Sequence, residues 1–206
     1  MAANSNATVV GHYSPRWLVV KRQGFLYLAP SAMLFSPDGP TRLLDGTVLP
    51  FDSDTKRISY QGVVEVPGTT KDQLYVRAYE WLAKTYRSAN AVIQMQDKEA
   101  GRLVGKGVMK VTLRGFNAGY VQHTITIYLK DGRYKYILTD FAHEAGGAKD
   151  VYSAGPLERP DGEVMAFGDK KTWDKVRRDA TADAELLIKD LQAAMTVKAG
   201  KDPSDF

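Results

Sequence analysis

The sequence predicts an α+β protein, a two-layer sandwich in which helices cover one face of an antiparallel sheet. Three observations predict this class. Several segments alternate apolar and polar residues with the period of two that half-buried strands require. Two segments, one after residue 70 and one between residues 171 and 195, place apolar residues at helical spacing. Asp131-Gly132 is a two-residue hairpin signal, because type I′ turns need positive φ. The predicted order of the core is strand, helix, four strands and helix.

Residues 1–54 are predicted to form an N-terminal extension. Residues 1–14 are small and polar, so we expect a frayed end. Residues 15–50 alternate short apolar runs with turn signals such as Gly24 and Asp45-Gly46, which predicts short strands and loops. This segment also carries aromatic side chains that need a surface to lie on: Trp17, Phe25, Tyr27 and Phe35.

The α+β domain is predicted over residues 55–195. Its first strand alternates from Ile58 to Val66 and ends at Pro67-Gly68. Thr70 and Gln73 then fit a capping box, in which each side chain satisfies a free backbone N–H. The helix that follows has an apolar stripe of Leu74, Ala78, Trp81, Leu82 and Thr85.

Four strands and a closing helix complete the predicted domain. The turn at Asp131-Gly132 sets a register in which Ile127 faces Tyr136 and His123 faces Asp140. Residues 144–170 are rich in Gly, Pro and acidic residues and form a connection. The closing helix carries the stripe Trp173, Val176, Ala180, Ala184, Leu187, Leu191 and Ala194. Residues 196–206 are predicted to be a flexible tail.

Composition excludes several classes of protein. The chain has 206 residues, of which 44% are hydrophobic and 25% charged, which is an ordinary globular composition. It has no cysteine, which excludes disulfides, thiol catalysis and thiolate metal sites. The longest apolar run is too short to span a membrane, and no secretion signal follows Met1. The net charge is +4, with an excess of basic residues between 102 and 143 that could attract an anionic partner.

His123 and Asp140 are predicted to lie opposite each other on the helix-facing side of the sheet. A His–Asp pair can act as an acid–base dyad, which would make the protein a small hydrolase or transferase. The alternative, which we favour, is a structural polar pair that satisfies its own hydrogen bonds and fixes the register. The sequence places no nucleophile beside the pair, so no catalytic residue is predicted.

The opposite face of the sheet is predicted to be open, and basic residues alternate there with aromatic ones. Such a face can bind nucleic acid or another anionic polymer, and Lys106, Lys110, Tyr128 and Lys135 are the candidate binding residues. Phe141 is expected on the same face. Solvation of this face, or its coverage by the N-terminal segment, is favoured over nucleic-acid binding.

No cofactor or metal ion is predicted. The run from Gly101 to Gly107 resembles a phosphate-binding loop but lacks its first Gly and its Ser or Thr, and it lies within a strand. Gly105 and Gly107 are instead expected to let a helix aromatic such as Trp81 approach the sheet. The three histidines lack ligand spacing, and Asp52-Ser53-Asp54 lacks the other ligands of a calcium loop.

Several motifs together resemble the bacterial family called domain of unknown function 4468. They are Val66-Pro67-Gly68-Thr69-Thr70-Lys71-Asp72-Gln73, Val92-Ile93-Gln94-Met95, Gly105-Lys106-Gly107, Lys130-Asp131-Gly132-Arg133-Tyr134 and Phe141-Ala142-His143-Glu144. The resemblance covers about residues 55–145 and implies a fold similar to one repeat of the TATA-box-binding protein (TBP). It implies no catalytic residues and no established activity, and it implies that members are often exported to the periplasm or cell envelope.

These observations lead to the hypothesis of a non-enzymatic binding or interaction module of a bacterial protein. The alternatives are an enzyme that uses His123 and Asp140, and a module that binds an anionic polymer or nucleic acid. The partner, the oligomeric state and the localisation do not follow from the sequence.

Overall fold

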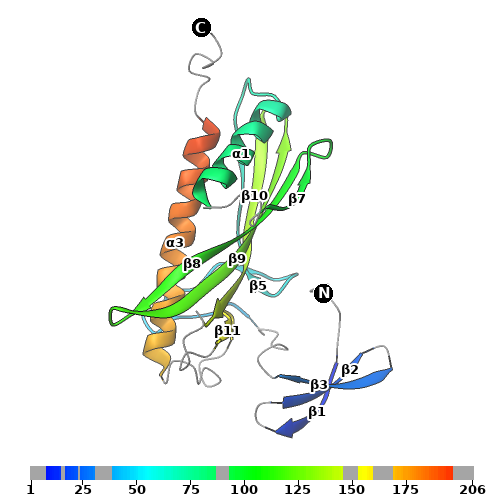
Figure 1. Ribbon diagram of the computed structural model, residues 1–206, viewed down its shortest axis with the longest axis vertical. Helices are drawn as coiled ribbons and strands as arrows, with labels where there is room; N and C mark the ends of the chain where they lie inside the picture. Colours follow the sequence, from blue (N-terminus) through cyan, green and yellow to red (C-terminus); the bar gives the residue numbers. More distant parts are fainter. Residues whose placement is uncertain are drawn as a thin grey trace.

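A six-stranded antiparallel sheet with two helices on one face forms the body of the protein (Figure 1). This computed structural model describes residues 8–14, 17–22, 24–30, 39–86, 93–145, 153–159 and 169–196. The strand order is β7-β8-β9-β10, with β6 and β11 both beside β10. The strands are β6 (Tyr60–Glu65), β7 (Ile93–Asp97), β8 (Arg102–Leu113), β9 (Phe116–Lys130), β10 (Arg133–Glu144) and β11 (Gly155–Pro156).

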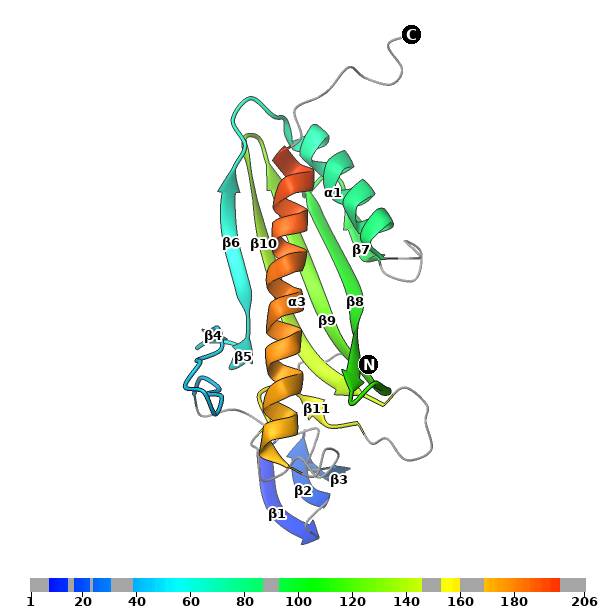
Figure 2. The same ribbon diagram turned by 90° about the vertical axis from the view of Figure 1, so that its left-hand side faces the viewer.

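Helices α1 (Lys71–Thr85) and α3 (Lys170–Thr196) lie on the same face of the sheet (Figure 2). The predicted capping box is confirmed, since the Thr70 side chain accepts from Gln73 N and the Gln73 side chain accepts from Thr70 N. Asp131 of the β9–β10 turn also accepts a hydrogen bond from Lys71 N at 2.7 Å. One turn residue therefore fixes the start of α1 against the end of the sheet, where a carboxylate also complements the helix dipole.

The core lies between the helices and the inner face of the sheet. It is built from Leu74, Trp81 and Leu82 of α1, from the stripe of α3, and from alternate residues of β8, β9 and β10. The helical stripes predicted from spacing are confirmed at most positions. Thr85, Leu187 and Ala194 are only half-buried, however, and Tyr75, Ile188 and Met195 are buried although they were not predicted. The α+β class and the order strand, helix, four strands, helix are confirmed, with one addition. The short strand β11 pairs with β10 within the segment 144–170 that the sequence predicts as a connection.

The hairpin register is confirmed only near the turn. Pairs from Arg133–Lys130 to Thr139–Thr124 follow the predicted register, but the next pair is Ala142–Gln122. Asp140 and Phe141 thus oppose the single residue His123, which is a β-bulge. Asp140 adopts φ 57°, a left-handed conformation that Asp tolerates better than most residues. The bulge shifts the inward-facing positions from even to odd numbers, so Phe141 and His143 point into the core.

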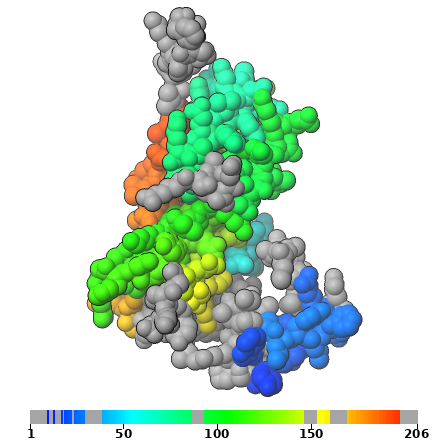
Figure 3. Space-filling view, in the orientation of Figure 1, coloured from blue at the N-terminus to red at the C-terminus, as the bar shows by residue number. Residues whose placement is uncertain are grey.

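A separate three-stranded sheet precedes the body. It consists of β1 (Thr8–Ser14), β2 (Trp17–Arg22) and β3 (Phe25–Pro30), joined in that order. Figure 3 shows it projecting from the lower end of the molecule. The expectation of a frayed end was wrong for residues 8–14, which pair with β2. A short hairpin of β4 (Phe51–Asp52) and β5 (Arg57–Ile58) leads into β6. The predicted tail after residue 196 lies outside the described residues.

Candidate functional site

The outer face of the sheet is open, and its register places basic and aromatic side chains side by side. Lys135, Tyr128 and Arg102 are directly opposed on β10, β9 and β8. Opposed residues of an antiparallel pair have Cβ atoms about 5 Å apart, so the three side chains form one row. The Arg102 guanidinium lies over the Tyr128 ring, 5.4 Å from its centroid. This contact orients the guanidinium along the surface of the sheet.

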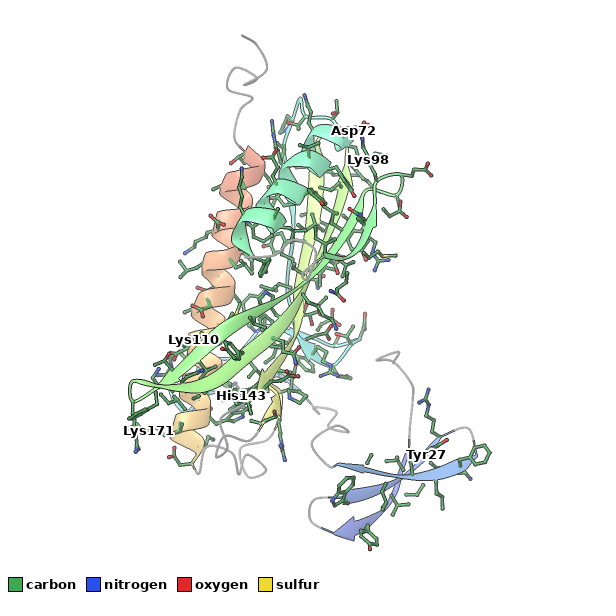
Figure 4. The ribbon with its side chains drawn as sticks, viewed as in Figure 1. Tyr27, Asp72, Lys98, Lys110, His143 and Lys171 are labelled. Carbon is green, nitrogen blue, oxygen red and sulfur yellow. The ribbon has the colours of Figure 1, made fainter. Side chains whose placement is uncertain are left out.

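Strand β8 carries a series of cations on this face. Arg102, Lys106 and Lys110 are four residues apart, which places them roughly 13 Å from each other along an extended strand. Lys106 and Lys110 are exposed, while Lys135 is half-buried. Figure 4 shows Lys110 near the lower end of the sheet. Among the described residues, Glu65, Asp97 and Glu144 share this face towards its margins, and Asp97 lies directly opposite Arg102. Asp52 lies close enough to Lys135 to attract it. Lys106 and Lys110 instead oppose Thr124 and Tyr120, so the positive charge of the face is concentrated along β8.

Apolar side chains accompany the cations. Val63 of β6 is 60% exposed and Val108 of β8 is 61% exposed, and Met95 and Tyr128 are also exposed. Because these side chains are open to solvent, none of the described residues covers the face. The predicted binding residues Lys106, Lys110, Tyr128 and Lys135 do share one surface, although Tyr128 and Lys135 are separated from Lys110 along the strands.

The predicted pair of His123 and Asp140 is not formed. His123 is 2% exposed and lies between the sheet and α1, whereas the bulge leaves Asp140 exposed. Phe141 takes the inner position instead, with its ring centroid 6.1 Å from that of His123. Phe141 was expected on the open face, and this was wrong for the same reason. A one-residue bulge reverses the side on which every later residue of the strand lies.

The partner of His123 is Tyr86, the C-cap residue of α1. Its hydroxyl lies 2.8 Å from His123 Nε2. His123 Nδ1 has no hydrogen-bond partner among the described residues. Burial lowers the pKa of His123 to about 4 and raises the pKa of Tyr86. The imidazole is therefore neutral at pH 7 and almost fully enclosed.

Gly107 makes this contact possible. A Cβ at Gly107 would overlap the Tyr86 ring and lie 2.7 Å from His123 Nε2. The expectation that a helix aromatic approaches the sheet at the glycines was therefore right in kind, but the aromatic residue at Gly107 is Tyr86 and not Trp81.

A second buried polar group joins α3 to the segments around it. Arg177 forms an ion pair with Asp174 at 3.1 Å, and both side chains are almost fully buried. Asp174 accepts a hydrogen bond from Leu44 N, and Arg177 donates to the carbonyl of Leu157. These contacts anchor two irregular segments to one helix. The sequence analysis missed them, although both residues adjoin the predicted stripe at Trp173 and Val176.

Glu158 and His143 are buried at the same end of the molecule. Glu158 accepts a hydrogen bond from Ile58 N at 2.7 Å, and burial raises its pKa. His143, labelled in Figure 4, lies 2.7 Å from the carbonyl oxygen of Ala118 and accepts from Ala154 N. Burial lowers its pKa. All of these polar groups bind backbone, which indicates a structural role.

Other kinds of site find no support in the described ranges. Within them, no three His, Asp or Glu side chains are grouped so that they could hold a metal ion. The Asp52 carboxylate instead accepts from Asp54 N and Thr55 N, as in an Asx turn. No helix among the described residues is long and apolar enough to cross a membrane.

The fold and its open sheet define the class as a TBP-like α+β domain. Residues 60–144 match the model of a family described as a domain of unknown function (DUF4468) with TBP-like fold, so the resemblance seen in the motifs is confirmed over this segment.

Two solved structures share the fold. A TBP-like protein from Parabacteroides distasonis ATCC 8503 is 17% identical, with a TM-score of 0.55 over 68% of this chain and 94% of the other. A DUF4468 family protein from Bacteroides ovatus ATCC 8483 is 16% identical, with a TM-score of 0.53 over 81% of this chain and 96% of the other. At this identity the likeness concerns the fold alone. No match was found among curated proteins.

Proposed function

We propose that the chain carries a bacterial, non-enzymatic binding module whose contact surface is the open face of the sheet and whose partner is anionic. The observation that carries this proposal is the combination of Arg102, Lys106, Lys110 and Lys135 with exposed apolar side chains on one uncovered face. Val63, Met95 and Val108 add exposed apolar area at separate points of the same face.

The cations and apolar residues have complementary roles in such a surface. Exposed lysines attract an anionic partner from solution and give an affinity that depends on salt. Tyr128 and Val108 offer flat and apolar area on which a sugar ring, a base or a side chain can pack. The candidate residues are spread across three strands and along β8, which suits an extended polymer better than a small metabolite.

The enzymatic alternative depended on a pair of residues that the bulge separates. Asp140 is exposed and His123 is buried against Tyr86, so the two cannot share a proton without refolding of β10. This separation supports a binding role over a hydrolase or transferase that uses these two residues.

The test is binding of a sulphated polysaccharide, heparin, to the full chain, measured by fluorescence anisotropy over a series of salt concentrations. The variant Lys106→Glu/Lys110→Glu reverses two charges on the open face. The matched control Lys84→Glu/Lys175→Glu makes the same charge change on exposed residues of α1 and α3.

We expect the open-face variant to weaken binding at least tenfold and the control to leave it within about twofold. Equal losses in both variants would mean that only net charge matters and would contradict a defined binding face. Binding of a single-stranded oligonucleotide in place of heparin, with the same loss in the open-face variant, would identify nucleic acid as the anionic partner.

A further inference from the structure

The N-terminal three-stranded sheet exposes apolar side chains that the rest of the described chain leaves uncovered. Phe25, Leu26, Tyr27 and Leu28 are four consecutive exposed residues of β3, with Phe25 at 68% and Leu26 at 64%. Trp17 of β2 is 42% exposed. Tyr27 is labelled on this sheet in Figure 4. Monomeric proteins seldom expose contiguous apolar surface of this kind unless it binds something.

The register shows that both faces of this sheet are apolar. Val19 and Lys21 oppose Leu28 and Leu26 on one face. Val20 and Arg22 oppose Tyr27 and Phe25 on the other face. A half-buried sheet would have one polar face. On β2 and β3 the charged exceptions are Lys21 and Arg22, which lie immediately before the turn, with Phe25 and Leu26 immediately after it. The third strand, β1, adds the polar residues Thr8, His12 and Ser14.

The charge of this segment selects among possible partners. Residues 1–37 contain no Asp or Glu, so every formal side-chain charge around the sheet is positive. Docking on the open face of the body would bring Lys21 and Arg22 towards Lys106 and Lys110, and a second copy of the same sheet would bring like charges together. Leucine and phenylalanine beside the cations suit acyl chains better than nucleic-acid bases. Aromatic, aliphatic and basic side chains together match the interface of an anionic lipid bilayer.

We propose that the β2–β3 hairpin attaches the protein to the surface of an anionic membrane. Phe25 and Leu26 enter the boundary between headgroups and acyl chains, while Lys21 and Arg22 contact lipid phosphates. Trp17 pairs with Pro30 at the other end of the hairpin, so it lies outside the inserted tip. This function is independent of the open face of the body, which remains free for a partner.

The test is sedimentation of the full chain with vesicles of phosphatidylcholine, with and without phosphatidylglycerol. We expect binding to the anionic vesicles and much weaker binding to the neutral ones. Trp81 and Trp173 are buried and Trp17 lies at the far end of β2, so the variant Phe25→Trp provides a reporter at the tip, and its fluorescence should shift to the blue on binding. Lys21→Gln/Arg22→Gln should reduce binding to anionic vesicles by about fivefold for each cation. Phe25→Ser/Leu26→Ser should reduce it at least tenfold.

The open-face variant Lys106→Glu/Lys110→Glu is the charge control. It should bind vesicles as the wild type does, whatever its affinity for heparin, so the two proposals can fail separately. An equal loss of vesicle binding in this control would move the lipid site to the body and overturn the inference. Absence of sedimentation of the wild-type protein, or of any fluorescence shift in Phe25→Trp, would also overturn it. So would a dimer in gel filtration that Phe25→Ser/Leu26→Ser dissociates without any lipid binding.

Discussion

Removal of His123 should abolish a large part of the acid sensitivity of the fold. The imidazole is 2% exposed, its pKa is lowered to about 4 by burial, and Nδ1 has no hydrogen-bond partner among the described residues. In the unfolded chain the pKa returns to its ordinary value near 6.5. The unfolded state therefore binds a proton at a higher pH than the folded state does.

The sign and size of the effect follow from linkage. The stability contributed by the neutral imidazole is present above pH 6.5 and is lost as the pH falls towards 4. A shift from about 6.5 to about 4 corresponds to roughly 3 kcal/mol in full, of which about 2 kcal/mol is lost by pH 5. Protonation would also place a charge beside the Tyr86 hydroxyl and the Phe141 ring.

Urea unfolding at pH 7 and pH 5 measures this contribution. His123→Leu should lose less stability than the wild type between the two pH values, by about 2 kcal/mol. Burial also lowers the pKa of His143, and this residue contributes to the pH dependence of stability in the same direction in both proteins. Glu158 has a raised pKa that acts in the opposite direction, and it too is present in both proteins. An equal loss in wild type and variant would refute the assignment of His123 as a buried neutral imidazole.

Three further substitutions test the packing of the same structure, all by urea unfolding at pH 7. Gly107→Ala should destabilise the fold by about 1–3 kcal/mol, because the added Cβ would meet Tyr86 and His123. The control Gly39→Ala should change the stability little, because its Cβ would meet nothing within 4 Å. Equal effects of the two substitutions would argue against the close approach of Tyr86. Asp174→Leu should lower the stability by about 3–5 kcal/mol, because it leaves Arg177 buried without its ion-pair partner. The double substitution Asp174→Leu/Arg177→Met should lower the stability less than the single one. A single substitution with no effect would contradict burial of the pair. Asp140→Val should cost about 1–2 kcal/mol at φ 57°, while Asp140→Gly should be tolerated, and equal effects of the two would contradict the bulge.

Local patterns in the sequence were sufficient for most of the body. The capping box at Thr70 and Gln73 and the apolar stripe of α3 each depend on residues a few positions apart, and both are observed. The Asp131-Gly132 turn determined the register as far as Thr139–Thr124. These features are local, so the physics that fixes them is present in short windows of sequence.

The bulge at Asp140 and Phe141 depends on the whole core and was missed. The inward positions Tyr134, Tyr136 and Leu138 are followed by Phe141, three residues later. This break in the period of two was the sequence signal for the bulge. The large apolar side chain of Phe141 enters the core and so determines where the bulge lies. The expected pairing of His123 with Asp140 was wrong because it assumed a register without the bulge. Tyr86 was missed because its partner His123 lies far away in the sequence. Asp174 and Arg177 are three residues apart, but the contacts that bury them, with Leu44 and Leu157, join segments far apart in the chain.

The central claim, that the open face binds an anionic partner, is tested most directly by lysine footprinting. Acylation of the full chain with and without heparin would compare Lys106, Lys110 and Lys135 with Lys84 and Lys175 on the helical side. We expect heparin to protect the three lysines of the sheet and to leave the two on the helices unchanged. Equal protection on both sides, or protection confined to the helices, would contradict a binding role for the open face.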